Sequence, residues 1–257
     1  MVKVFRILNM AALIVTIAVN YLSNTGFFNN ETMASISARF QNLFTPAGYA
    51  FSIWGLIYVA LLGFVIHYGP FTKNTNAKQK TVLNIGWWFV ISCAANCLWI
   101  VAWLYEYTLL TIPVMIVIFI SLMKIILNNK GTIEAKNLQT AIFLRLPFYI
   151  YSGWISVALI ANVAAYLKKI GWSGFGFSET LWTIVMFIVA AIIHLYMVWK
   201  RDMASFALVA VWALVAIAVA NQNGNETVHI SAIVTAVFLA LNAGARILTH
   251  QKTRSIN

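Results

Sequence analysis

Long apolar runs are the feature of this 257-residue sequence that most restricts its fold. We find such runs at residues 4–23, 47–69, 81–105, 107–127, 138–166, 180–199, 204–221 and 228–248. An α-helix needs roughly 20 apolar residues to cross a bilayer, and each run is close to that length. Inside a bilayer the backbone must satisfy its own hydrogen bonds, which helices do. The sequence therefore predicts an all-α polytopic membrane helix bundle with about eight transmembrane helices.

The low content of charged residues and their positions exclude several classes of function. Charged residues make up 9% of the chain, whereas soluble domains carry about 25%. The acidic residues lie in loops or at the ends of the runs, which argues against a carrier built on an intramembrane carboxylate. The net charge of +11 comes from basic residues in short loops, so membrane topology explains it and we expect no nucleic-acid partner.

Basic and non-basic connections alternate along the chain, which gives the orientation. The basic ones are the N-terminus, 70–80, 124–137, 200–201 and the C-terminal tail. Loop 167–179, with Lys168, Lys169 and Glu179, is the one ambiguous connection. The positive-inside rule then predicts that both termini are cytoplasmic. Short loops and this alternation favour a bacterial inner membrane for an integral, multi-pass protein.

Three runs carry a stripe of aromatic and amide side chains on one helix face, because residues at i, i+3 and i+7 lie on the same side. The stripes are Phe51, Trp54 and Tyr58; Asn96, Trp99 and Trp103; and Tyr151, Trp154, Ala158 and Asn162. All three lie roughly 10–13 Å from the predicted outer helix ends. Aromatic rings with a few polar groups are typical of a site for a flat apolar ligand. The alternative is that the rings simply pack and the amides join helices.

Three short motifs in these stripes point to a family. The segment from Pro46 to Tyr58 has the form Pro…Phe…Trp…Leu-x-Tyr, Asn96-Cys97-Leu98-Trp99 has Asn-x-x-Trp, and Trp154 begins Trp-x-x-x-Ala-x-x-x-Asn. Together they resemble the second, third and fifth helices of the translocator-protein, or tryptophan-rich sensory protein (TspO), family. The resemblance covers about residues 1–166 and implies a TspO-like five-helix membrane domain there. Residues 167–257 are then an additional three-helix membrane segment with a short basic tail.

The resemblance implies a ligand cavity lined by the first, second, third and fifth helices beneath the first loop. It assigns to that cavity Pro46, Trp54, Tyr58, Asn96, Trp99, Trp154, Ala158 and Asn162; the stripes add Phe51, Trp103 and Tyr151. The family binds porphyrins, haem-like tetrapyrroles and, in some members, sterols. We therefore expect a porphyrin or haem-like ligand, with no required cofactor, no metal site and no catalytic residue. The sequence departs from the family in its single Pro46, where two prolines are usual.

Three functional interpretations follow, with the bilayer and a small apolar ligand as partners. The first is a membrane sensor or carrier for a flat apolar molecule, which the family links to tetrapyrrole and stress signalling. The second is a transporter in which the sixth to eighth helices are a moving half. The third, a light-dependent porphyrin-degrading enzyme, ranks lower because no nucleophile–base pair or metal cluster is visible. Alanine-rich runs 204–221 and 228–248 favour close helix packing, either within the chain or in a homodimer.

Overall fold

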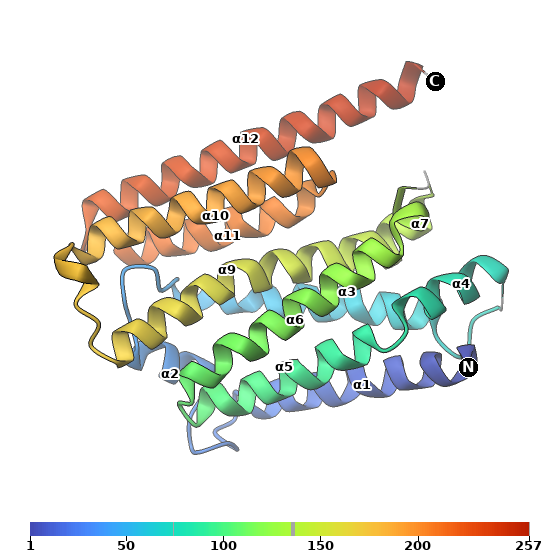
Figure 1. Ribbon diagram of the computed structural model, residues 1–257, viewed down its shortest axis with the longest axis horizontal. Helices are drawn as coiled ribbons and strands as arrows, with labels where there is room; N and C mark the ends of the chain where they lie inside the picture. The colour runs from blue at the N-terminus through green and yellow to red at the C-terminus, as the bar shows by residue number, and fades with distance from the viewer. Residues whose placement is uncertain (74, 135–136, 257) are drawn as a thin grey trace. The chain divides into compact units, whose positions relative to one another are not determined.

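The computed structural model describes residues 1–73, 75–134 and 137–256, and these ranges form helices and loops without a strand (Figure 1). Within them, 7 helical segments are long and apolar enough to cross a membrane, and a bent helix pair raises this to 8. The segments are Val2–Leu22, Gly48–Tyr68, Thr108–Asn128, Leu138–Lys169, Glu179–Arg201, Ala204–Asn221 and Glu226–Thr249, with the pair Asn76–Ile85 and Trp88–Leu104. The predicted polytopic helical membrane protein is confirmed.

Contacts divide the chain into two compact units, which we describe separately. Unit 1 comprises Met1–Arg39 and Ile53–Ile155, and unit 2 comprises Phe40–Ser52 and Ser156–Asn257. Helix α9 (Leu146–Lys169) begins in unit 1 and continues in unit 2. The domain boundary expected at residue 166 came from the family resemblance and stays a prediction.

Unit 1 is built around helix α5, which packs against α1 and α6, while α1 also contacts α3 (Figure 1). Its elements besides the start of α9 are α1 (Val2–Leu22), α2 (Met33–Arg39), α3 (Ile53–Tyr68), α4 (Asn76–Ile85), α5 (Trp88–Leu104), α6 (Thr108–Asn128), α7 (Lys130–Glu134), α8 (Leu138–Thr140) and the π-helical turn η2 (Ala141–Arg145). A tight turn between α5 and α6 makes these two helices direct neighbours. Glu106 in that turn has a φ of 61°.

The apolar run 81–105 is not one straight helix, which corrects the sequence prediction. The chain is helical from Asn76, breaks at Gly86 and resumes at Trp88, with a bend of 44° between α4 and α5. Gly86 has φ 51° and ψ −131°, a conformation that L-residues with a side chain rarely adopt. A single glycine therefore ends α4 and redirects the chain.

The run that contains Pro147 is irregular just before the proline. The segment Leu138–Lys169 passes through one π-helical turn, η2, and then continues as α9. Proline has no backbone N–H and cannot complete the regular ladder, and a single turn inside an α-helix is the usual form of the rare π-helix. Across from this turn, a Cβ on Gly63 of α3 would lie 3.3 Å from the Phe143 ring. The missing side chain at position 63 lets α3 approach η2 closely.

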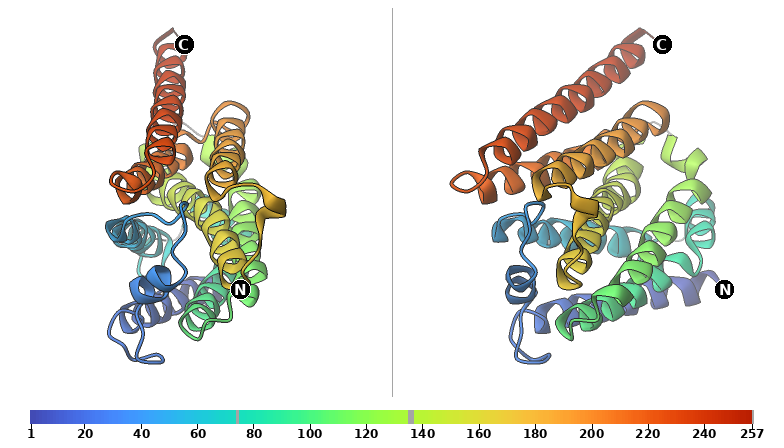
Figure 2. Two further views of the ribbon diagram at one scale, coloured as in Figure 1. Left: turned by 90° about the vertical axis from the view of Figure 1, so that its left-hand side faces the viewer. Right: turned by 60° about the vertical axis from the view of Figure 1, so that its left-hand side comes forward.

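Unit 2 contains three long helices that lie side by side in each view (Figures 1 and 2). Its elements besides the end of α9 are the 3₁₀ turns η1 (Gly48–Ser52) and η3 (Gly174–Gly176), α10 (Glu179–Arg201), α11 (Ala204–Asn221) and α12 (Glu226–Ile256). Alanines at the helix contacts are buried: Ala207, Ala210, Ala213, Ala216, Ala232, Ala236 and Ala243. Small side chains let membrane helices approach closely, and the alanines of α11 and α12 serve that purpose within this chain.

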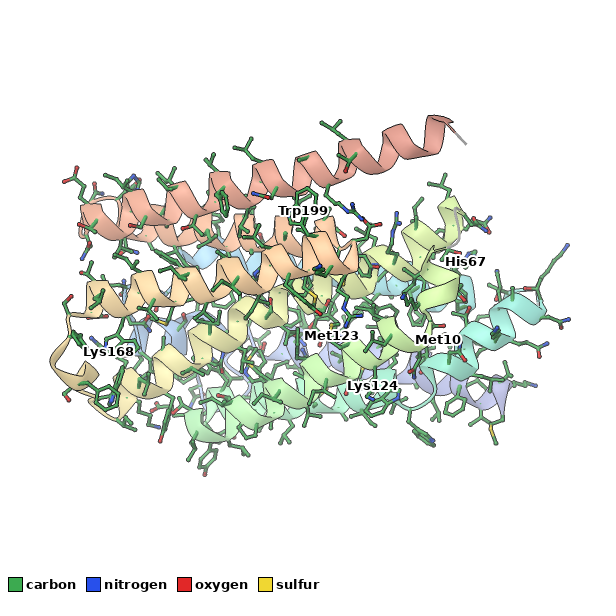
Figure 3. The ribbon with its side chains drawn as sticks, turned by 45° about the horizontal axis from the view of Figure 1, so that its top comes forward. Met10, His67, Met123, Lys124, Lys168 and Trp199 are labelled. Atoms are coloured by element: carbon green, nitrogen blue, oxygen red, sulfur yellow. The ribbon has the colours of Figure 1, made fainter. Side chains whose placement is uncertain are left out.

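The end of α10 is joined to α12 by polar contacts. Trp199, which Figure 3 places beside α12, donates its indole N–H to Asn242 Oδ1 at 3.0 Å. Arg246 pairs with Asp202 at 2.9 Å and lies over the Trp199 ring. Asp202 itself has a left-handed backbone conformation, with φ 57°, that ends the helix. These contacts fix the turn between α10 and α11 against α12.

Candidate functional site

Six aromatic side chains from three helices of unit 1 gather into one group, which we call the aromatic cluster. Its members are Trp54 and Tyr58 of α3, Trp99 and Trp103 of α5, and Tyr151 and Trp154 of α9. The Trp54 ring is central. Its centroid lies 5.6 Å from Tyr58 in a stacked arrangement and 6.3 Å from Trp99. Tyr151 and Trp154 approach it edge-on, at 5.7 and 6.3 Å. Two residues from each predicted stripe thus meet.

The members of the aromatic cluster differ in burial. Trp99, Tyr151 and Trp154 are 4%, 2% and 3% exposed. Trp54 and Tyr58, both on α3, are only half-buried. Since aromatic rings attract flat partners by stacking and edge contacts, the α3 face is where a ligand can reach the rings. The α5 and α9 rings form the wall behind it.

A buried amide holds this wall in place. Asn96 of α5 is fully buried, and its Nδ2 donates to the Tyr151 hydroxyl at 3.0 Å. Its Oδ1 accepts a hydrogen bond of 2.9 Å from Asn20 Nδ2 of α1. An unsatisfied amide in an apolar interior is costly, so these bonds fix the relation of α1, α5 and α9. Both ends of the Asn96 amide are therefore used within the protein.

The Tyr58 hydroxyl has a different environment. It is buried and makes no hydrogen bond of good geometry with any described residue, although the Asn20 amide is close enough to act on it. Leaving a buried hydroxyl without a partner costs free energy. This hydroxyl would therefore gain from a polar group on a ligand.

Asn20 is a site residue that the stripes did not identify. Successive members of the set Asn9, Thr16 and Asn20 are seven and four residues apart, so the three share a face of α1. Asn9 and Thr16 are each 3% exposed, and the Thr16 hydroxyl bonds to the Ala12 carbonyl at 2.8 Å. Three polar residues on one face of an apolar run were the available signal. That pattern indicates the side of α1 that faces other helices.

Four predicted site residues lie in unit 2 rather than in the aromatic cluster. Pro46 precedes η1, which contains Phe51 and packs on α11. The neighbouring Ala47 N–H donates to the Ala216 carbonyl at 3.0 Å. Ala158 and Asn162 lie on the later part of α9, where Asn162 Nδ2 donates to the Ala158 carbonyl at 3.0 Å. The seven remaining predicted residues, Trp54, Tyr58, Asn96, Trp99, Trp103, Tyr151 and Trp154, belong to unit 1.

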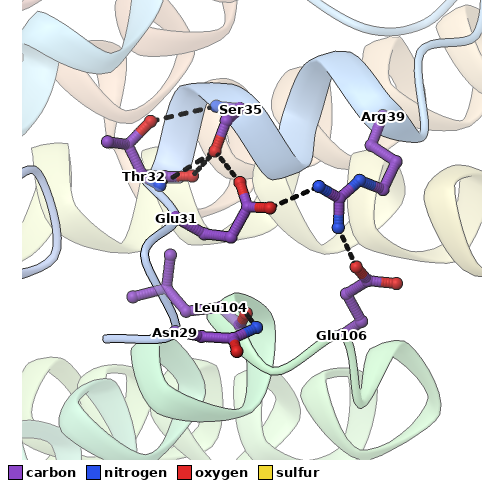
Figure 4. A network of polar contacts seen from close by, with 7 residues as sticks. All are labelled: Asn29, Glu31, Thr32, Ser35, Arg39, Leu104 and Glu106. Atoms are coloured by element: carbon purple, nitrogen blue, oxygen red, sulfur yellow. Dashed lines mark hydrogen bonds and ion pairs between the residues drawn. The ribbon is translucent and has the colours of Figure 1, made fainter. Parts of the chain in front are cut away.

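The first loop is fastened to the end of α5 by an ion-pair network of Glu31, Arg39 and Glu106 (Figure 4). Arg39, at the end of α2, pairs with both carboxylates. Asn29 Nδ2 adds a hydrogen bond of 3.1 Å to the Leu104 carbonyl. The loop is thereby held at the end of the helix that carries Trp99 and Trp103.

Local charge shifts the pKa values in this network. Hydrogen bonds from Ser35 and then Arg39 stabilise the charged form of Glu31 and lower its pKa. Hydrogen bonds to Glu31 and Glu106 raise the pKa of Arg39. Both shifts favour the charged pair at neutral pH. The fastening is therefore electrostatic, and it depends on the ionisation of Glu31.

The model of a family described as TSPO-like protein matches residues 6–245. No curated protein and no solved structure matches the chain. The matched range extends past residue 166 and includes α10, α11 and most of α12. The C-terminal helices thus lie within the same family match as the aromatic cluster.

Proposed function

This chain belongs to the TSPO-like protein family, and on that premise we propose that it is a sensor or carrier that binds a flat apolar ligand in the aromatic cluster. The family has a ligand-binding role in membranes in general terms. Our proposal adds the ligand class, porphyrin-like or sterol-like, and the place. It also keeps the bacterial inner membrane and cytoplasmic termini as expectations.

The position of Trp54 carries the proposal. Its ring contacts four other rings and yet is only half-buried. Aromatic contacts of this kind contribute about 0.5–1.5 kcal/mol each beyond area burial. A flat ligand that slides against Trp54 replaces ring–ring contacts with similar ones, so little is lost when the cluster opens. It also gains the burial of its own apolar surface.

Polar groups supply orientation. Asn96 is occupied by Tyr151 and Asn20, so its role is to hold the wall rather than to contact the ligand. The Tyr58 hydroxyl is then the group that pairs with a polar edge of the ligand. A carboxylate of a porphyrin or the hydroxyl of a sterol would accept a hydrogen bond there.

Quenching of tryptophan fluorescence in the purified protein by protoporphyrin IX tests the proposal. We expect saturable quenching and, for Trp154→Ala, affinity lower by at least about tenfold, because a buried aromatic contributes a large apolar area. Trp87→Phe is the matched control, since Trp87 is 57% exposed. A fluorescent sterol is the second probe. If neither probe saturates, or if folded Trp154→Ala binds both as well as the wild type, the proposed function is wrong.

A transporter is the second candidate, because contacts place α10, α11 and α12 in a unit distinct from the one that holds the aromatic cluster. A transporter moves its ligand between the two sides of a sealed vesicle, whereas a sensor only retains it. Porphyrin uptake into proteoliposomes, with Trp154→Ala as the control, separates these roles. Absorption spectra recorded in darkness and in light in the same samples test for porphyrin breakdown.

A further inference from the structure

Unit 2 contains a cavity of about 390 Å³ at the junction of α9 and α10, which we call the interfacial cavity. The end of α9, the loop 170–178, the start of α10 and Asn42 line it. Lining residues that matter here are Lys168, Trp172, Phe177, Glu179 and Trp182. Its volume falls in the range of about 300–1,000 Å³ that is usual for small-molecule sites.

Two tryptophans form one wall of this cavity. The rings of Trp172 and Trp182 lie 4.9 Å apart, and the Trp182 indole N–H donates to the Gly174 carbonyl at 2.8 Å. Gly174 has a φ of +67°, and a Cβ there would lie 3.1 Å from the Trp182 ring. The positive φ and this close approach to Trp182 both favour a residue without a side chain at position 174. The aromatic wall is fixed before any ligand arrives.

Opposite charges lie in the same cavity. Lys168 Nζ and Glu179 Oε2 are 3.8 Å apart, and both side chains are about half exposed, at 51% and 49%. An exposed pair at this distance is weak, so a ligand can replace it at little cost. Glu179 Oε1 also accepts a hydrogen bond of 3.1 Å from the Leu43 N–H. That bond keeps the carboxylate in the cavity.

From the ends of the spanning segments we infer that the cavity lies at the level of the lipid headgroups. The spanning segment of α9 ends at Lys169, and that of α10 begins at Glu179. Between them the loop exposes apolar side chains: Ile170 is 53% exposed, Phe175 78% and Phe177 59%. Exposed aromatic residues beside lysines are typical of chain that rests in the membrane interface. The ligands most abundant at that depth are phospholipid headgroups.

We propose that the interfacial cavity binds the zwitterionic headgroup of a phospholipid. Lys168 contacts the phosphate, while Glu179 and the faces of Trp172 and Trp182 contact the ammonium group. Cations are attracted to tryptophan faces, and each charge of the headgroup replaces one partner of the weak ion pair. An anionic headgroup would bring its phosphate to Lys168 but leave Glu179 without a cation. An apolar ligand would desolvate the pair without compensation.

Native mass spectrometry of the full-length protein, titrated with dioleoyl phosphatidylethanolamine, phosphatidylcholine and phosphatidylglycerol, tests this site. We expect the two zwitterionic lipids to bind at least about fivefold more tightly than phosphatidylglycerol. Lys168→Gln and Glu179→Gln should each weaken phosphatidylethanolamine binding about three- to tenfold. Gln at 179 keeps an acceptor for the Leu43 N–H, so the fold is preserved. Lys200→Gln is the control, because Lys200 is exposed at the other end of α10.

Distinct outcomes would overturn the proposal. Equal or tighter binding of phosphatidylglycerol would show a simple anion site, and wild-type affinity in both cavity variants would place the lipid elsewhere. Soluble glycerophosphoethanolamine identifies the source of the headgroup, since we expect the lipid to bind at least about tenfold more tightly. Equal affinity would exclude a lipid ligand. Porphyrin quenching is measured separately on the same variants, so failure at one site does not imply failure at the other.

Discussion

Tryptophan residues build both the aromatic cluster of unit 1 and the interfacial cavity of unit 2, but they are arranged differently in the two places. In the cluster, tryptophans project from three helices and their rings contact one another around Trp54. In the cavity, Trp172 belongs to a loop and Trp182 to a helix start, and the two rings leave space beside them. Residues at regular spacing lie on one helix face and so bring their side chains together. The loop that turns at Gly174 has no such regular spacing.

The polar residues of the cluster and of the cavity also differ in burial and in pairing. Asn96 is fully buried, with a hydrogen bond at each end of its amide. Lys168 and Glu179 are half exposed and only loosely paired. Buried polar groups with all partners present stabilise one arrangement, while weakly paired exposed charges are available to a ligand. We therefore expect the cluster to open when it binds a ligand, whereas the cavity is already open.

The largest effect that we predict is for Asn96→Ala. This substitution leaves the buried Tyr151 hydroxyl without its Asn96 partner, while the half-buried Asn20 Nδ2 keeps only its bond to the Thr16 carbonyl. We expect a loss of about 2–3 kcal/mol in the free energy of unfolding. Reversible unfolding in detergent, followed by tryptophan fluorescence, measures it.

The control for this prediction is Asn128→Ala. Asn128 is exposed at the end of α6, where its Nδ2 bonds to the Asn84 carbonyl at 3.0 Å. We expect a change within about 0.5 kcal/mol there. Equal effects at the two positions would mean that the Asn96 amide does not hold the cluster together. The cluster would then not differ from the cavity in having a buried polar group that stabilises it.

Much of unit 1 could be predicted because its signals are local in sequence. The length of the apolar runs predicted the spanning segments, and helical spacing predicted the three stripes from which Trp54, Trp99 and Trp154 come together. Asn20 was not identified because its importance depends on which helix α1 meets. The break at Gly86 depends on a backbone conformation, φ 51°, that the residue type permits but does not require.

Unit 2 shows where sequence reasoning ends. The motif from Pro46 to Tyr58 predicts the start of one helix, but its first part is the 3₁₀ turn η1 and α3 begins at Ile53. The turn is held by Trp212, whose indole N–H donates to the Ala50 carbonyl at 3.2 Å. Trp212 is far away in the sequence, so no local pattern reveals this contact. The interfacial cavity likewise depends on how Gly174 packs on Trp182.

A smaller effect is predicted for Gly174→Ala. Its Cβ would lie 3.1 Å from Trp182, and the φ of +67° adds backbone strain. We expect a loss of about 1–2 kcal/mol in unfolding free energy and weaker phosphatidylethanolamine binding in the titration above.

Gly176→Ala is the matched control, since Gly176 has a φ of +83° but nothing within 4 Å of its Cβ position. It shares the strain without the contact and should retain lipid binding. If both variants lose binding equally, loop conformation rather than the fixed Trp182 wall determines the cavity.

The smallest predicted effect concerns pH and the ion-pair network that fastens the first loop. Hydrogen bonds from Ser35 and Arg39 lower the pKa of Glu31 below its ordinary value of 4.5. Its stabilising contribution is therefore present above pH 4.5 and is lost as the pH falls through the lower, folded value. We expect Glu31→Gln to lower the Tm by about 1–2 °C at neutral pH, since exposed ion pairs are weak. The two Tm curves should converge under acid conditions.

The double variant Glu31→Gln, Arg39→Gln separates the contribution of Arg39 to loop stability from that of Ser35. Without Arg39, the charged group that faces Glu31 is gone and only the Ser35 hydrogen bond remains of the two that lower its pKa. The effect of Glu31→Gln measured in the Arg39→Gln background should then be smaller than in the wild type, which a double-mutant cycle resolves. An unchanged effect, or a Tm difference that persists below pH 4, would show that the first loop is held by packing. In that case the ion pairs of Glu31, Arg39 and Glu106 would contribute no more to the structure of unit 1 than the weak Lys168–Glu179 pair contributes to the cavity.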